Sequence, residues 1–187
     1  MNRKRNITIL SAIGILALVL TTGWSVLAGA AWPPEPYQVF SMAGAWTETS
    51  DLDEPGNITI ITISPEDPWT GTGFVVATEI SMDPTFGGQI PDATSQTPWF
   101  GTYVRTGLNT SQAKVVSYVR KDGKPKPIIL GILVIEHTTT MTAPDAEEAV
   151  GTFSLYSPAS DKDADGLPDA GEQPLMSLPI TQHMKRI

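Results

Sequence analysis

The chain consists of short apolar or alternating runs separated by turn residues, and this pattern constrains its fold more than any other feature. Seven runs follow one another, at residues 37–49, 57–63, 73–80, 99–105, 113–120, 128–135 and 150–156. Sixteen glycines and sixteen prolines among 187 residues disfavour a helical bundle. We therefore predict an all-β fold: a single antiparallel β-barrel of about eight strands, with a β-sandwich as the alternative.

Three segments carry further expectations about this fold. Apolar residues change parity between Ile60 and Ile61, which predicts a β-bulge at that point. The segment from Ile128 to Ile135 is too short and too rich in β-branched residues for a membrane span, and it favours a buried strand that residues 138–142 extend. The long connection from Met82 to Thr97 is rich in Pro, Gly and Asp, which is typical of a functional or lid-like loop.

Twelve residues near the C-terminus, DKDADGLPDAGE from Asp161 to Glu172, have the ligand spacing of an EF-hand calcium loop. Acids stand at loop positions 1, 3, 5, 9 and 12, and Gly166 stands at the sharp turn of position 6. The predicted Ca²⁺ ligands are Asp161, Asp163, Asp165, the carbonyl of Leu167, Asp169 and Glu172. The alternative is a solvated acidic turn, since Asp and Gly favour turns in any case.

The flanks of this loop are poor in helix signals. Pro158 precedes the loop, Pro174 follows it, and Pro168 replaces the apolar residue that usually pairs two EF-hands. The twelve residues resemble the DxDxDGLPDxxE loops of thrombospondin type 3 repeats and of many secreted bacterial proteins. That resemblance implies a structural Ca²⁺ that binds more weakly than in a cytosolic sensor.

The N-terminus carries a targeting signal. Residues 3–5 are basic, residues 7–31 form an uncharged apolar run, and Ala28-Gly-Ala30 is an A-x-A cleavage signature. We expect cleavage before Ala31 and a secreted, periplasmic or cell-surface protein; an uncleaved membrane anchor is the alternative. The chain has no cysteine, so disulfides and lipoprotein anchoring through a cysteine are excluded.

The expected division of the chain follows from these signals: a signal peptide (1–30), a β-barrel domain (31–160), a calcium-binding loop (161–172) and a C-terminal tail (173–187) that includes His183. Cleavage leaves nine basic and twenty acidic residues, a net charge of −11. A surface this acidic disfavours nucleic acid and anionic membranes as partners, and it favours cations. Membrane association is expected only if the N-terminal segment stays uncleaved.

The order of strands adds a second resemblance. Gly44-Ala-Trp46 resembles the G-x-W motif that opens lipocalin and calycin barrels. The runs at 101–105, 115–119 and 151–153 are similar to the later strands of small secreted lipocalin-like domains. The lipocalin T-D-Y motif and the disulfide cysteines are missing, so the resemblance is to a calycin-like barrel rather than to a true lipocalin.

Four residues are the candidate ligand-binding set: Trp99, Phe100, Tyr103 and Arg105. The aromatic residues can line an apolar cavity or fill a solid core, and the arginine can pair an anion or stack on a ring. His137 follows Glu136 at the end of an apolar strand, where a solvent-facing role is favoured over a site at the barrel mouth.

The sequence contains no G-x-S-x-G, H-E-x-x-H or phosphate-binding glycine loop, so an enzyme is the less favoured class. Three functions remain open. The first is an exported, calcium-stabilised barrel that binds a small apolar ligand. The second is a cell-surface structural or interaction module with a calcium clip, and the third is a cyclase- or isomerase-like barrel enzyme.

Overall fold

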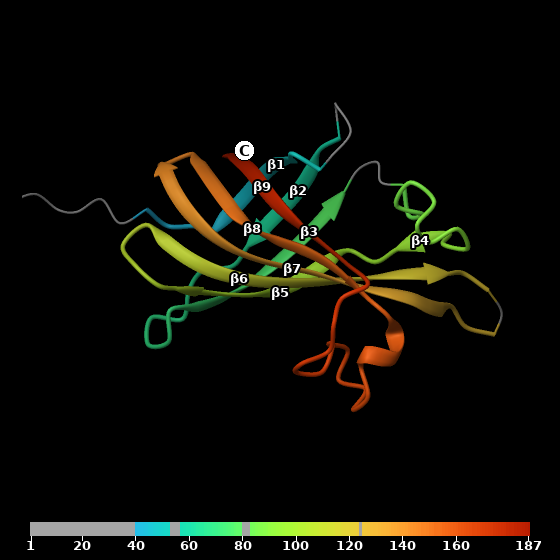
Figure 1. Ribbon diagram of the computed structural model, residues 1–187. Helices are drawn as coiled ribbons and strands as arrows, with labels where there is room; N and C mark the ends of the chain where they lie inside the picture. Colours follow the sequence, from blue (N-terminus) through green and yellow to red (C-terminus); the bar gives the residue numbers. More distant parts are fainter. Residues whose placement is uncertain (1–39, 53–56, 80–82, 124) are drawn as a thin grey trace, which may run out of the picture. The chain divides into compact units, whose positions relative to one another are not determined.

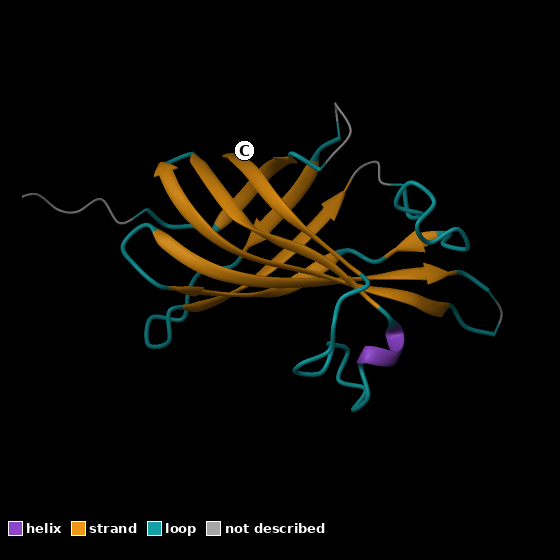
Figure 2. Cartoon of the chain, in the orientation of Figure 1, coloured by secondary structure: helices purple, strands orange, loops and turns teal. Residues whose placement is uncertain are grey.

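The computed structural model describes residues 40–52, 57–79, 83–123 and 125–187. The chain divides into two units, Met1–Gln38 and Val39–Ile187, and the described fold belongs to the second. Its strands are β1 (Gly44–Ser50), β2 (Thr59–Ile63), β3 (Thr72–Glu79), β4 (Ser95–Gln96), β5 (Trp99–Arg105), β6 (Thr110–Lys121), β7 (Ile128–Ala143), β8 (Ala146–Tyr156) and β9 (Met176–Arg186). The described part has no α-helix, only the 3₁₀ turn η1 (Pro158–Ser160) (Figure 2).

Eight of the strands close into an antiparallel barrel. Each strand pairs with its neighbours along the chain in the order β1-β2-β3-β5-β6-β7-β8-β9, and β9 returns to pair with β1 (Figure 1). The short strand β4 is an addition that pairs only with the end of β6. The all-β barrel prediction is confirmed, and the β-sandwich alternative is wrong because the sheet closes on itself.

Buried and exposed residues alternate along β2 and β3, as the wall of a barrel requires, whereas β6, β7 and β8 contain runs that are buried on both faces. In β2, Thr59, Ile61 and Ile63 are buried while Ile60 is exposed. β2 stays in regular register with both neighbours, so the predicted bulge at Ile60–Ile61 is wrong. The parity change instead reflects an apolar side chain on the outer face. Register shifts occur elsewhere, between Val119 and Arg120 and between Met141 and Ala143.

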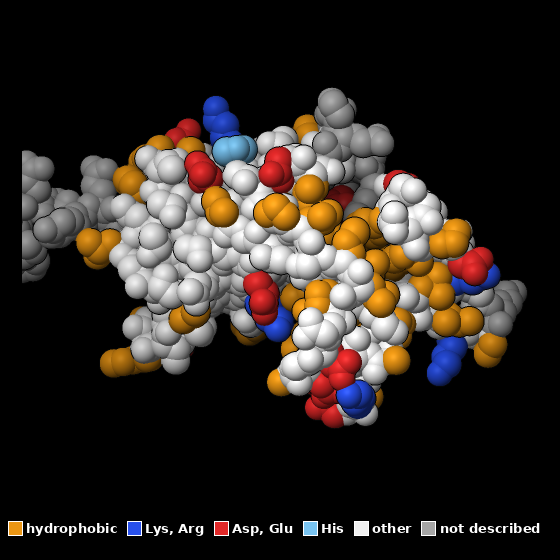
Figure 3. Space-filling view, in the orientation of Figure 1, with side chains coloured by type: hydrophobic (Ala, Val, Ile, Leu, Met, Phe, Trp, Pro, Cys, Tyr) orange, Lys and Arg blue, Asp and Glu red, His pale blue; other side chains and the backbone are white. Residues whose placement is uncertain are grey.

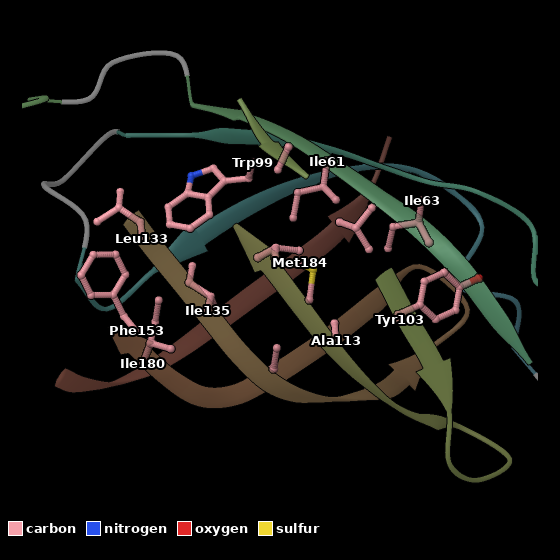
Figure 4. Close-up of a cluster of buried hydrophobic side chains, with 14 of the residues drawn as sticks. Ile61, Ile63, Trp99, Tyr103, Ala113, Leu133, Ile135, Phe153, Ile180 and Met184 are labelled. Carbon is pink, nitrogen blue, oxygen red and sulfur yellow. The ribbon is translucent and has the colours of Figure 1, made fainter. Parts of the chain in front are cut away.

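The barrel interior holds the main apolar core. Figure 4 shows side chains from both halves of the barrel converging on it, with Trp99, Phe153 and Leu133 towards one end and Tyr103 and Ile63 towards the other. The rings of Trp99 and Phe153 meet edge to face, with centroids 6.3 Å apart. Burial of these aliphatic and aromatic groups is the main source of folding free energy.

The C-terminal segment completes the barrel. Residues 173–187 are predicted above as a tail, and that prediction is wrong for β9, which pairs with β8 over ten residues and with β1 over five. The alternation of Ile180, Gln182 and Met184, all buried, follows the period of a strand. Gln182 masks this pattern in the sequence, because a polar residue occupies one of the buried positions.

One end of the barrel is closed around Trp46 of the G-x-W motif. Trp46 is fully buried, and its Nε1 donates to the Met42 carbonyl at 2.9 Å. The Arg186 guanidinium carbon lies 4.4 Å from the indole centroid, and its Nη1 donates to the Ala43 carbonyl at 3.0 Å. Arg186 also donates to the Ser41 carbonyl. This last-strand arginine therefore joins the segment before β1 to the end of the chain by a cation–π contact and two hydrogen bonds.

The outer wall of the barrel has a second apolar cluster beneath the loop that joins β8 to β9. The cluster contains Val116, Ile132 and Val134, with Tyr118, Tyr156 and Leu167 packed against it. Leu167 belongs to the predicted calcium loop. In Figure 3, acidic side chains gather at the tip of this loop, away from the barrel wall. The loop therefore has an apolar anchor on the barrel and an acidic exposed end.

Gly151 in β8 allows an unusually close approach to β7. A Cβ atom at this position would lie 2.1 Å from the Glu136 carbonyl oxygen and 2.6 Å from the His137 Cα. Such a glycine marks a bend in a barrel wall. We expect Gly151→Ala to lower the free energy of unfolding by about 1–3 kcal/mol, as overpacking does.

Urea unfolding measures the effect of this change. Gly123→Ala is the matched control, because a Cβ there meets nothing within 4 Å, and it should leave the midpoint unchanged. Equal midpoints for the two variants would contradict the packing account.

Candidate functional site

The barrel encloses a cavity of about 500 Å³ at the end opposite the closed end around Trp46. The strands of the barrel form its wall, and the segment after β3, here called the mouth loop, contributes Asp83, Phe86, Gly87 and Gln89. The lining residues are Glu48, Ser50, Leu52, Asn57, Thr59, Ile61, Val75, Ala77, Glu79, Asp83, Phe86, Gly87, Gln89, Trp99, Val115, Ile135, His137, Phe153, Met176, Leu178, Ile180 and Gln182. Most of the middle of the wall is apolar, and polar groups concentrate at its base and rim.

The polar base of the cavity is formed by Glu48, Gln182 and His137. Glu48 and Gln182 are each 5% exposed, and the Gln182 Nε2 donates to the Glu48 carboxylate. Gln182 pairs with Ala149 across β8 and β9, while His137 pairs with Gly151 across β7 and β8. The two small residues of β8 leave space for the Gln182 and His137 side chains to reach each other inside the barrel.

His137 is held in its neutral form at this base. Burial lowers the pKa of His137 to about 4, although the contact with Gln182 favours the charged form. The His137 Nδ1 and the Gln182 Oε1 are buried without a hydrogen-bond partner. The favoured solvent-facing interpretation of His137 is therefore wrong: the side chain lies at the cavity base, with Glu136 outside and paired to Lys114 at 3.0 Å.

The mouth of the cavity is covered in part by the segment after β3. Its Phe86 ring packs against Phe153 in a tilted arrangement, with centroids 5.8 Å apart, and the Phe86 φ of 52° lies in the left-handed region. Asp83 holds this turn, because its carboxylate accepts from the Thr85 and Gly87 amides at 2.9 and 3.0 Å. The Thr85 hydroxyl also donates to this carboxylate. That hydrogen bond, followed by those from the two amides, lowers the pKa of Asp83. An aromatic side chain is thus turned from the loop into the barrel.

Of the four residues predicted to bind a ligand, the structure places one in the cavity. Trp99 is buried in the wall, and its Nε1 donates to Glu79 at 2.6 Å. Phe100 is 45% exposed on the outer face, where its ring lies 5.8 Å from Tyr118. Adjacent strand residues face opposite sides, so Trp99 and Phe100 cannot share a cavity.

The other two predicted residues, Tyr103 and Arg105, lie toward the closed end of the barrel. The Tyr103 Oη donates to the Ser64 carbonyl at 2.9 Å, and burial, followed by the charge of Glu66, raises the pKa of Tyr103 to about 12. Arg105 forms an ion pair with Glu66 and donates to the Phe40 carbonyl at 3.1 Å. Its charge is therefore used within the fold and does not face the cavity.

The sequence analysis missed Glu48, Gln182 and the mouth residue Phe86. Glu48 lies two positions after Trp46 on β1, so its inward direction follows from the strand period once Trp46 is assigned to the core. Gln182 was hidden by the assignment of its segment to a tail. Phe86 lies in a loop, and no periodicity predicts the direction of a loop side chain.

The predicted calcium loop brings three of its acids together. Carboxylate oxygens of Asp161, Asp163 and Asp165 lie within 4.8 Å of one another. The Asp161 carboxylate accepts from the Asp165 and Gly166 amides, both at 3.0 Å. Gly166 has a φ of 92°, which a glycine adopts easily at a sharp turn. The loop is therefore curled around the carboxylate at its first position.

The remaining predicted ligands of this loop contact Lys162 or the barrel. The Lys162 Nζ forms an ion pair with Glu172, and the Asp169 Oδ2 accepts from the Lys162 amide at 2.8 Å. Leu167 packs on the outer apolar cluster. The donor set still fits a hard cation, since five carboxylates and a carbonyl supply the oxygen ligands that Ca²⁺ prefers.

Tyr118 connects this loop to the barrel wall. Its Oη donates to the Gly166 carbonyl at 2.8 Å, which fixes the middle of the loop against β6. Burial, together with the negative charges of Asp161 and Asp165, raises the pKa of Tyr118. A cation among these acids would therefore act on a segment that is packed against the barrel.

The closed end contains a carboxyl group without hydrogen bonds. Glu147 is 3% exposed and neither of its oxygens has a partner, so burial raises its pKa to about 7 against the opposing charge of Arg186. A raised carboxyl pKa means that the folded state binds the proton more tightly than the unfolded state. Glu147 therefore lowers stability progressively as the pH rises from about 4.5 to about 7.

We expect Glu147→Gln to raise the free energy of unfolding at pH 8 by at most about 3 kcal/mol, at 1.36 kcal/mol per pKa unit. The gain should disappear below pH 4.5. Unfolding curves of both proteins across this pH range measure it, and Glu148→Gln, which changes the exposed neighbour, should show no such dependence. A constant difference between Glu147→Gln and the unmodified protein would contradict the assignment.

Comparisons with known proteins add the following. No protein-family model matches the chain, and no curated protein matches it. Among solved structures, EF1p2_mFAP2b bound to DFHBI is similar with 17% identity and a TM-score of 0.40, over 78% of this chain and 93% of that chain. The identity and TM-score are too low to indicate what this chain binds. In the described residues no helix is long and apolar enough to cross a membrane, and residues 1–30 lie outside that part.

Proposed function

We propose that the protein is an exported, calcium-stabilised β-barrel that binds a small apolar ligand inside the barrel. The observation that carries the proposal is the cavity of about 500 Å³ between the polar base at Glu48 and the mouth loop at Phe86. Ligand sites in proteins usually have volumes of about 300–1,000 Å³, with mainly apolar walls and a few polar groups. The barrel interior has all three properties.

The distribution of side chains supports a binding role for this space. The cavity is lined by apolar groups such as Ile135 and Phe153 and by the small residue Ala77, and it still leaves a volume of about 500 Å³. A barrel that needed only stability would gain by filling this volume, because empty apolar space forfeits packing contacts. The retained space, with polar groups at its base, is therefore better explained by an occupant.

Calcium binding is the second part of the proposal. It is supported by the ligand spacing of Asp161–Glu172, by the clustering of the three aspartates and by the turn at Gly166. When bound, Ca²⁺ would supply the positive charge that these carboxylates lack. The apolar anchor of Leu167 and the hydrogen bond of Tyr118 would transmit the added order to β6 and β7.

Export is the third part, and it rests on the sequence. The basic residues 3–5, the apolar run and Ala28-Gly-Ala30 are the features of a cleavable signal peptide. The intact mass of protein secreted by its native host is expected to correspond to a chain that begins at Ala31. Full-length protein in the membrane fraction would instead support an anchor.

The binding proposal is tested by filling the cavity. We expect decanol, a neutral apolar probe, to bind with one-to-one stoichiometry in calorimetric titrations. Ala77→Leu should weaken this binding and Ala77→Trp should abolish it, because each adds volume to the cavity wall. Val76→Trp is the matched control, since Val76 is the neighbouring residue on the outer face and is 49% exposed.

Ala77→Leu adds less volume to the cavity wall than Ala77→Trp, so it still tests the proposal if Ala77→Trp does not fold. Circular dichroism and urea unfolding identify folded variants before titration. A folded protein that shows no saturable binding of decanol would contradict the proposal and would favour the structural or interaction module. Binding that Val76→Trp and Ala77→Leu affect equally would place the site outside the barrel.

A further inference from the structure

We infer that the hairpin of β6 and β7, at the mouth end of the barrel, docks on an anionic lipid surface through Ile128, Ile129 and the lysines beside them. Docking goes beyond the proposed function and does not depend on it, because it requires no ligand in the cavity. The residues that carry it lie on the outside of the molecule, at the end opposite Trp46.

The hairpin extends beyond the barrel wall. β7 pairs with β8 only from Ile132 onward, where Tyr156 ends β8, whereas residues 128–131 pair with β6 alone among the described strands. Figure 1 shows both strands continuing past the point where β8 ends and β9 begins. Four residues of strand span roughly 13 Å, so the start of β7 reaches about that far past the end of β8. We call residues 120–123 and 125–131 the hairpin tip.

The hairpin tip is apolar for an exposed strand. Ile128 is 61% exposed and Ile129 is 46% exposed, and they lie in register with Lys121 and Arg120 of β6. Figure 3 shows apolar side chains gathered more densely over the mouth end of the barrel than over the closed end in the same view. Apolar side chains exposed together on a projecting element are typical of an interaction surface.

Basic residues accompany these isoleucines, although the protein as a whole is acidic. Four of the nine basic residues that remain after cleavage lie in residues 120–126, with one acid among them, a net charge of +3. Lys121 pairs with Asp92 at 3.1 Å, which reduces this charge to +2, and Lys126 forms no ion pair with any described residue. The overall charge of −11 disfavours an anionic membrane, and the hairpin tip is the local exception.

The same residues disfavour a second copy of the chain as the occupant. Two copies that met at this edge would bring like charges together. Lysine and proline at an exposed strand edge also discourage pairing between edges, and Pro125 and Pro127 stand on either side of Lys126. A lipid surface requires no backbone pairing, because isoleucines can enter the boundary of the acyl chains while lysines reach the phosphates.

Flotation with lipid vesicles tests the inference. The chain from Ala31 onward is used, since the apolar run of residues 7–31 would bind lipid by itself, and Val39–Ile187 contains the whole described barrel. Excess chelator prevents calcium from bridging the acidic loop to the lipid. We expect binding to vesicles of equal parts phosphatidylcholine and phosphatidylglycerol, and roughly tenfold weaker binding to phosphatidylcholine alone. Salt should weaken the binding to the anionic vesicles.

Variants of the lysines test the contribution of charge. Lys121→Gln/Lys126→Gln should weaken binding to the anionic vesicles by about thirtyfold, at about fivefold for each lysine near the surface. Lys114→Gln/Lys185→Gln is the matched control, because it removes the same charge from exposed positions on the barrel wall and should change binding little.

Variants of the isoleucines test the contribution of apolar surface. Ile128→Ser/Ile129→Ser should weaken binding by about tenfold or more, since two apolar side chains no longer leave water. Ile60→Ser/Phe74→Ser changes two exposed apolar residues on the outer face of β2 and β3, and it should leave binding unchanged. Circular dichroism identifies the folded variants before flotation.

The outcomes separate docking from the proposed function. Equal binding to both kinds of vesicle, or an equal loss in a tip variant and its control, would overturn the inference. A protein that binds decanol but no vesicles would also overturn it and would leave the function of the cavity intact. Self-association that Ile128→Ser/Ile129→Ser abolishes, in a protein that binds no vesicles, would assign the hairpin tip to a second copy instead.

Discussion

Replacement of Trp46 by alanine is expected to lower the free energy of unfolding by about 3–5 kcal/mol, which is the usual loss for a large buried aromatic residue. Trp46 is fully buried, its Nε1 donates to the Met42 carbonyl, and Arg186 stacks on its ring. The substitution removes all three contacts at once. A loss of this size is a large fraction of the stability of an ordinary domain.

Urea unfolding followed by circular dichroism measures this change. Trp69→Ala is the matched control, because Trp69 is 92% exposed in the β2–β3 turn and its loss should change stability by less than about 0.5 kcal/mol. Arg186→Gln should give an intermediate loss, since the indole stays in the core while the stacked cation is removed. A Trp46→Ala protein as stable as Trp69→Ala would contradict the role of this end of the barrel.

The sequence predicted the barrel because its evidence is repeated in most of the strands. Alternation, turn residues and the absence of long amphipathic segments all favoured the same class, and one wrong detail such as the bulge at Ile60 did not alter it. β9 was missed because its buried positions are Ile180, Gln182 and Met184. The polar residue among them interrupts the alternation of apolar and polar residues that indicates a strand. A buried glutamine looks like a surface residue until its partner Glu48 is known.

The candidate site inside the barrel was less predictable for a related reason. Aromatic residues near the long loop were the available signal, and one of them, Trp99, lies in the cavity wall together with Glu79. Polar residues that define the base come from β1, β7 and β9, which are far apart in the sequence. Their proximity depends on how the barrel closes and on the small residues Ala149 and Gly151 between them, and neither is visible in local spacing.

Removal of calcium is expected to lower the melting temperature by about 8–16 °C relative to saturating calcium. A ligand at a thousandfold excess over its dissociation constant stabilises the folded state by about 4 kcal/mol, and a domain of this size shifts by about 2–4 °C per kcal/mol. The physical reason lies in the loop: Asp161, Asp163 and Asp165 place their carboxylates within 4.8 Å, where they repel one another without a cation. Thermal unfolding in millimolar calcium and in excess chelator measures the shift.

Variants of the loop show whether the shift comes from this site. Asp161→Ala and Glu172→Ala should each abolish the calcium response, whereas Asp92→Asn, which changes an exposed acid outside the loop, should preserve it. Lys162→Gln should strengthen calcium binding, because it releases Glu172 from its ion pair and removes a positive charge from the site. Magnesium should substitute poorly, since it requires a tighter octahedral shell. Identical melting temperatures in calcium and in chelator would leave the loop as an acidic turn held by Lys162 and Tyr118 alone.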